Sequence, residues 1–145
     1  MTQVLRGNIV HAPAMGRLDI LEHGCLVLED GVITGLYPDL PAHLEGAEVR
    51  DFGDRIIMQS FADMHLHAPQ YPMLGMGMDL PLLDWLNTYT FPTEARFADL
   101  DYAPPVYRRL ATDLITHGPT RVCMFSSLHT PPTLALLDDL DLAAL

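Results

Sequence analysis

The sequence contains few cysteines, few basic residues and no long apolar run. Its 2 cysteines, Cys25 and Cys123, have no paired spacing, which excludes a disulfide framework and a four-cysteine metal site; both lie in apolar segments that predict buried free thiols. With 8 basic residues against 19 acidic ones, the formal net charge is −11, which disfavours nucleic-acid polymers as partners. No apolar run approaches the roughly 18 residues of a membrane span, and the N-terminus lacks the apolar core of a signal peptide. These absences predict a soluble, cytoplasmic protein without a membrane partner.

The composition that remains is that of a folded protein. Apolar residues make up 49% of the sequence and charged residues 19%, which is typical of globular chains. A length of 145 residues suffices for one modest domain or for a piece of a larger one.

Residues 1–58 predict a small β domain. Its predicted strands are residues 3–10, 25–29, 32–37 and 55–58. The first of them is short and mixed, which favours an edge position. Asp30 and Gly31 separate two β-prone runs, and this pair is typical of a type I′ hairpin turn, where both central residues need positive φ. Residues 38–53 are rich in turn formers and charge and predict a loop.

Residues 59–145 instead alternate between strand and helix patterns. The predicted elements are a strand over 60–67, a helix over 79–89, a helix over 104–117, a strand over 122–125 and a helix from Thr130 onward. Asp79 is the expected cap of the first helix, Pro92 its expected stop, and Gly118 the expected C-terminal residue after the second. This order indicates an α/β domain with a parallel sheet. Two such units do not close a core, and the sequence ends inside a helical pattern, so we expect a truncated domain.

Two histidines at the end of the strand over 60–67 are the strongest chemical signal. His65 and His67 are two residues apart, and side chains at i and i+2 of a strand lie on the same side. Two imidazoles that converge in this way can bind zinc or iron. Asp63 lies on the same side and could orient a histidine. A bare His-x-His also occurs by chance on surfaces, and a catalytic zinc needs about three protein ligands.

The other histidines add little to this pair. Three of them, His11, His23 and His43, lie in the β domain and are expected to be solvated or structural. His117 ends a helix, where a cation is favourable. His129 follows the strand over 122–125, and it is either a loop histidine or a residue on the same rim as His67.

These residues resemble a known signature. The run Asp63-Met64-His65-Leu66-His67 resembles the D-x-H-x-H pattern that ends the first barrel strand of the amidohydrolase superfamily, and the Asp30-Gly31 hairpin resembles its small N-terminal, β-sandwich-like domain. Residues 67–72, and the long run over 79–94 from Asp79-Leu80-Pro81 to Phe91-Pro92-Thr93-Glu94, are similar to the guanine deaminase family. The resemblance extends from about residue 24 to the end of the chain.

The resemblance implies a fold and a reaction. The expected fold is the N-terminal part of a (β/α)8 TIM barrel over 59–145, preceded by the small β domain over 1–58. The expected reaction is the zinc-dependent hydrolytic deamination of guanine to xanthine and ammonia, with iron as the alternative metal. His65 and His67 match two metal ligands. His67, Ala68, Pro69 and Gln70 match the segment that contacts the purine, with Gln70 as its hydrogen-bonding residue. Family members are expected to be homodimers.

Several family features have no counterpart in these 145 residues. The remaining metal ligands and the proton-shuttling glutamate cannot be placed, so no catalytic residue is assigned and the isolated chain is expected to be inactive and poorly soluble. Gln59-Ser60 replaces the usual Pro-Gly before the strand, and Pro119 and Arg121 depart from the usual loop. Two alternatives stay open: another aminohydrolase of the same superfamily, and a non-catalytic truncated product.

Overall fold

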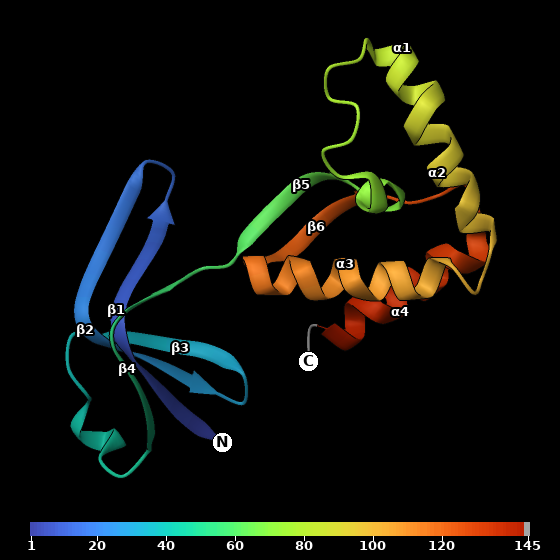
Figure 1. Ribbon diagram of the computed structural model, residues 1–145. Helices are drawn as coiled ribbons and strands as arrows, with labels where there is room; N and C mark the ends of the chain where they lie inside the picture. Colours follow the sequence, from blue (N-terminus) through green and yellow to red (C-terminus); the bar gives the residue numbers. More distant parts are fainter. Residues whose placement is uncertain (144–145) are drawn as a thin grey trace. The chain divides into compact units, whose positions relative to one another are not determined.

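The computed structural model describes residues 1–143 and divides the chain into two compact units, Met1–Gln59 and Ser60–Leu145 (Figure 1). The first unit consists of strands, and the second combines strands with helices. Among the described residues, no helix has both the length and the apolar character that crossing a bilayer would require.

The first unit is built on one mixed sheet of four strands. Its strands are β1 (Thr2–Ala14), β2 (Arg17–Glu29), β3 (Val32–Tyr37) and β4 (Glu48–Met58), in the spatial order β3-β2-β1-β4. The β1–β2 and β2–β3 pairs are antiparallel, whereas β4 runs parallel to β1 after a short helical turn, Ala42–Leu44. Val4, Cys25 and Val27 form the buried cluster of this unit, and burial raises the pKa of the Cys25 thiol.

The hairpin prediction is confirmed at the β2–β3 turn. Asp30 and Gly31 have φ values of 48° and 81°, the left-handed conformations that a type I′ turn requires. Glu29 pairs with Val32 directly across the turn. The local sequence was sufficient here because the turn geometry is set by the two central residues themselves.

We expect Gly31→Ala to destabilise the protein by about 1–2 kcal/mol, the cost of placing a Cβ in left-handed backbone. A Cβ at this position meets no atom within 4 Å, so the cost comes from the backbone conformation and not from a clash. Urea unfolding measures it, with Gly31→Asn as the control, because asparagine tolerates this conformation. Equal losses in both variants would contradict the explanation.

Two predictions for this unit are wrong. The first strand is not at an edge, because β1 pairs with β2 on one side and β4 on the other. Its mixed composition arises because Val4 and Ile9 are buried while Gln3 and Arg6 are exposed. The predicted loop over 38–53 is also too long, since β4 begins at Glu48 and pairs with Gln3 of β1. That pairing joins residues 45 positions apart and leaves no local signal.

The second unit contains two parallel strands and several helices. Its elements are β5 (Phe61–His67), η2 (Ala68–Met73), α1 (Leu82–Trp85), the π-helical turn Leu86–Thr90, α2 (Phe91–Ala95), η4 (Arg96–Ala98), α3 (Ala103–His117), β6 (Pro119–Phe125) and α4 (Thr130–Ala143). The β5–β6 pair is parallel, and α3 lies in the connection between the two strands. This arrangement confirms an α/β unit with parallel strands.

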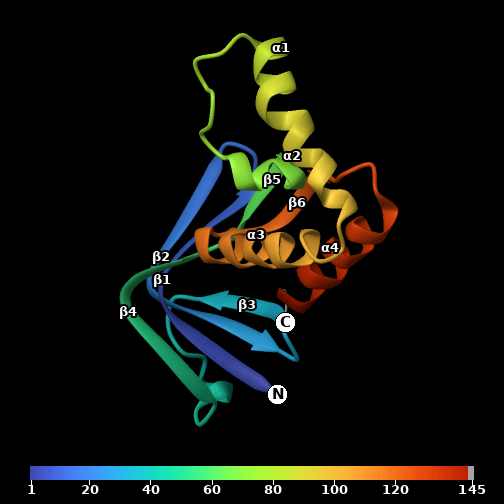
Figure 2. The ribbon, with the colours of Figure 1, turned by 45° about the vertical axis from the view of Figure 1, so that its right-hand side comes forward.

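Helices cover one face of the strand pair. Figures 1 and 2 show α3 running beside β5 and β6, and α4 packs against α3. The buried cluster consists of Ala68, Phe97, Ala103, Tyr107, Leu110 and Leu136. Leu66 of β5 and Met124 of β6 pack against this cluster, so their neighbours in sequence lie on the other face. Cys123, next to Met124, is accordingly exposed, which corrects the prediction that both thiols are buried.

The helix end predicted from Gly118 is right, and the helix end predicted from Pro92 is wrong. Gly118 ends α3, as predicted. It has a left-handed conformation with φ of 103°, and its N–H donates a hydrogen bond to the Ile115 carbonyl. Pro92 does not stop the preceding helix, which continues through α2. The N–H of Phe91 bonds the Leu86 carbonyl five residues earlier, and this widened turn gives the Pro92 ring room. The helix also begins at Leu82, later than the predicted cap at Asp79.

Candidate active site

The candidate site begins at the C-terminal end of β5, where two imidazoles meet. Because Leu66 packs into the helical core, strand alternation places His65 and His67 on the opposite face. The Nε2 atoms of the two rings are 3.1 Å apart. The ring of Phe125, which pairs with His67 across the strands, stacks on the His67 imidazole with centroids 4.7 Å apart. The pair is therefore convergent, and one of its rings is held by packing.

The spacing of the two nitrogens fits a shared metal ion. Two zinc–nitrogen bonds of about 2.0–2.1 Å at a tetrahedral angle would place the nitrogens about 3.3 Å apart. The observed Nε2–Nε2 distance of 3.1 Å is close to that value. Within residues 1–143, however, no third histidine, cysteine or acidic side chain joins them to form a metal-binding group, and His129 is not brought into the pair. The described residues thus bring together two candidate metal donors, fewer than the three protein ligands of a catalytic zinc.

Asp63 acts on the backbone of the pair and not on a ring. Its Oδ1 accepts a hydrogen bond from the His65 N–H at 3.0 Å. The strand register is irregular between Asp63 and Leu66, so that two residues of β5 oppose one of β6. By accepting a hydrogen bond from the His65 N–H, the Asp63 side chain compensates for the strand pairing that is lost at this bulge. The carboxylate therefore holds the bulge that carries His65.

The turn after the strand places the next predicted residues. Ala68, Pro69 and Gln70 open the short helix η2 directly after His67. Ala68 and Pro69 are buried, with Ala68 0% exposed as a whole residue, so His67 and Gln70 are the residues of this segment that remain accessible to a ligand. The half-buried Gln70 side chain donates from Nε2 to Oε1 of Glu94 at 3.0 Å. Glu94 comes from α2, and this pairing joins positions 24 apart.

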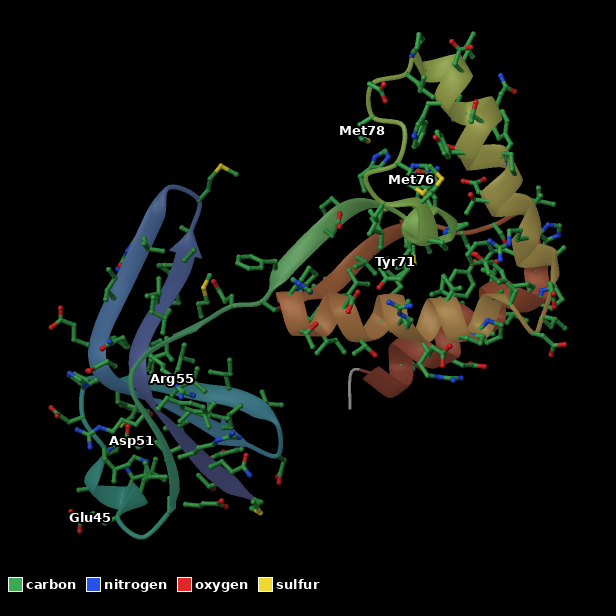
Figure 3. The ribbon with its side chains drawn as sticks, in the orientation of Figure 1. Glu45, Asp51, Arg55, Tyr71, Met76 and Met78 are labelled. Carbon is green, nitrogen blue, oxygen red and sulfur yellow. The ribbon has the colours of Figure 1, made fainter. Side chains whose placement is uncertain are left out.

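A cleft of about 370 Å³ brings these groups to one place. It lies between β5, η2 and α3, and it therefore adjoins the helical side of β5 as well as the two imidazoles. Its lining consists of His65, Leu66, His67, Gln70, Tyr71, Leu74, Leu110, Asp113, Leu114 and His117. Tyr71, labelled in Figure 3, belongs to η2, and its side chain reaches α3, where its hydroxyl donates to the carboxylate of Asp113. That hydrogen bond raises the pKa of Tyr71 above its usual value. The phenol is therefore neutral at physiological pH, and its hydrogen bond to Asp113 connects η2 to α3.

Sequence reasoning missed Glu94, Tyr71 and Asp113 as residues around the site. Glu94 and Tyr71 lie within the two runs that resemble the guanine deaminase family, and Asp113 is an ordinary polar position of a predicted helix. No local spacing connects them, since their partners lie 24 and 42 positions away. The packing of α2 and α3 against η2 brings Tyr71 and Asp113 to the cleft and brings Glu94 to the side chain of Gln70.

Comparison with known proteins decides the relationship. The chain is 35% identical over 144 residues to guanine deaminase of Dictyostelium discoideum, covering 88% of this chain and 32% of that protein. It is 33% identical over 150 residues to guanine deaminase of Homo sapiens, covering 97% and 33%. The chain is homologous to guanine deaminases. No family model matches the chain.

Solved guanine deaminases share the structure as well. A guanine deaminase from C. acetobutylicum, with guanine bound in its active site, superposes with a TM-score of 0.94 at 39% identity, covering all of this chain and 35% of that one. A triazine hydrolase variant superposes with a TM-score of 0.74 at 14% identity, which shows a shared fold only. The chain spans about a third of the length of the guanine deaminases it matches.

Proposed function

We propose that this chain contributes the metal pair and a purine-binding segment to an enzyme that hydrolyses guanine to xanthine and ammonia. The observation that supports this most directly is the convergence of His65 and His67, with Nε2 atoms 3.1 Å apart, in a chain whose homologues are guanine deaminases. The proposed architecture is a (β/α)8 barrel, with β5 and β6 as its first two strands and the first unit as part of the small β domain.

The donor set favours zinc, with iron as the other candidate, because imidazole nitrogens suit borderline metals. His65 and His67 would hold the ion through their Nε2 lone pairs. When bound, the metal supplies Lewis-acid chemistry that activates water for attack on the purine C2, which bears the amino group. Stacking on Phe125 restricts rotation of the His67 ring, so this ligand is oriented before the metal arrives.

Gln70 is the proposed contact to the purine edge. Its carboxamide provides both an acceptor and donors, and it lines the same cleft as the two histidines. Ala68 and Pro69 belong to the same proposed purine-binding segment, but both are buried and neither lines this cleft. A purine held there lies next to the metal pair, which is the arrangement that hydrolysis at C2 requires.

The test is turnover by the protein encoded by the complete reading frame that contains this chain, with zinc supplied. Guanine, adenine, cytosine and an amino-triazine are compared by product formation and ammonia release. We expect xanthine and ammonia in equal amounts from guanine, loss of turnover after chelation, and recovery with zinc. Turnover of another aminoazine in place of guanine would assign a different aminohydrolase, and no turnover of any would indicate a non-catalytic product. The 145 residues alone are expected to be inactive, because the described part provides two metal ligands.

A further inference from the structure

The hydrogen bond between Gln70 and Glu94 has a consequence for substrate selection. Resting on the proposed function, we propose that Glu94 is a positioning residue that fixes which end of the Gln70 carboxamide faces the purine. The bond runs from Gln70 Nε2 to Glu94 Oε1 at 3.0 Å in a half-buried setting. Glu94 does not line the cleft, whereas Gln70 does, so Glu94 acts through Gln70 and not on the ligand.

The direction of this bond follows from the chemistry of the two groups. A glutamate carboxylate only accepts hydrogen bonds, so it can pair only with the NH2 end of the carboxamide. Gln70 is then left with its carbonyl oxygen as an acceptor and one N–H as a donor. Without Glu94 the carboxamide could rotate by half a turn and exchange these two positions. Glu94 thus makes Gln70 complementary to a purine edge that presents a donor and an acceptor in one fixed order.

The helix geometry explains how Glu94 reaches Gln70 from a distant segment. Each residue of an α-helix turns the chain by about 100°, so the direction of a side chain depends on every turn before it. The π-helical turn Leu86–Thr90 precedes α2 and holds more residues per turn than an α-helix. This change in rotation about the helix axis places half-buried Glu94 on the side of α2 that packs against η2. Among described residues, Gln70 is the hydrogen-bond partner found for the Glu94 side chain.

The test compares Glu94→Gln and Glu94→Asp in the protein encoded by the complete reading frame, loaded with zinc. Guanine turnover is measured together with the binding of isoguanine, in which the 2-amino and 6-oxo groups are exchanged. In Glu94→Gln a second carboxamide can donate or accept, so Gln70 is free to rotate. We expect the preference for guanine over isoguanine to fall about tenfold, mainly through a higher KM, with the zinc content unchanged. Glu94→Asp keeps an acceptor-only group and should retain most of the preference.

The control is Glu45→Gln, the same change at an exposed glutamate of the first unit. Wild-type selectivity in Glu94→Gln would overturn the inference. A lower melting temperature and lower turnover, with an unchanged preference for guanine over isoguanine, would also overturn it, because that combination indicates a purely structural role for Glu94. Should Glu94→Gln fail to fold, Glu94→Met, which packs similarly but makes no hydrogen bond, replaces it in the comparison with Glu94→Asp, and wild-type selectivity in Glu94→Met would likewise overturn the inference. If the wild-type protein neither binds nor hydrolyses guanine, the proposed function fails first, which distinguishes that outcome from failure of the Glu94 inference alone.

Discussion

Replacing His65 or His67 with alanine is expected to remove the bound metal and to lower guanine turnover by about a thousandfold or more. The two Nε2 atoms, 3.1 Å apart, are the metal donors that the proposed function assigns to the described residues, so the loss of either leaves one. Metal catalysis contributes several kcal/mol, and each 1.36 kcal/mol corresponds to a factor of ten in rate. Metal content per protein and kcat/KM for guanine measure the effect in the complete protein.

The matched control for this prediction is His43→Ala, which removes an exposed histidine of the first unit. It should leave metal content and turnover unchanged. His117→Ala is a more demanding comparison, because His117 lines the same cleft but its Nδ1 lies 2.7 Å from the Asp113 carbonyl. Full metal occupancy in both His65→Ala and His67→Ala would contradict the assignment of this pair.

The second large effect concerns the core beneath the site. Phe97→Ala is expected to lower the free energy of unfolding by about 3–5 kcal/mol. Phe97 is 0% exposed, and its ring lies 4.9 Å from the Tyr107 ring and 5.3 Å, edge-on, from that of Tyr102. Truncation removes these contacts and leaves a cavity beside Ala68, the first residue of η2. Urea unfolding of the complete protein gives the magnitude.

Phe91→Ala is the matched control for the core prediction. Phe91 lies earlier in the same continuous helical segment, α2 followed by η4, but is 54% exposed. Its truncation should cost less than about 1 kcal/mol, as is usual for exposed positions. Similar losses in the two variants would show that the Phe97 cluster is not the stabilising core of this unit.

The parts of the fold that the sequence predicts correctly are those set by neighbouring residues. Asp30 and Gly31 define their turn by their own φ angles, and Gly118 ends α3 by the same means. The alternation of His65, Leu66 and His67 follows from strand geometry, and it places the two imidazoles together. Each of these features needs only a few consecutive residues.

The parts that the sequence does not predict depend on distant partners. The interior position of β1 follows from its parallel pairing with β4, which local composition does not encode. Pro92 is tolerated because the preceding turn is π-helical, a state that no single residue specifies. At the site, the Glu94–Gln70 bond arises only when α2 packs against η2. Local patterns therefore indicate the chemistry, and tertiary contacts determine how it is oriented.

The most direct test of the metal pair is an X-ray structure of the zinc-loaded complete protein, with anomalous data collected at the zinc edge. We predict one anomalous peak within about 2.0–2.1 Å of Nε2 of both His65 and His67, beside the Gln70 carboxamide. A peak that contacts neither ring, or no peak at this pair in a protein that deaminates guanine, would contradict the account.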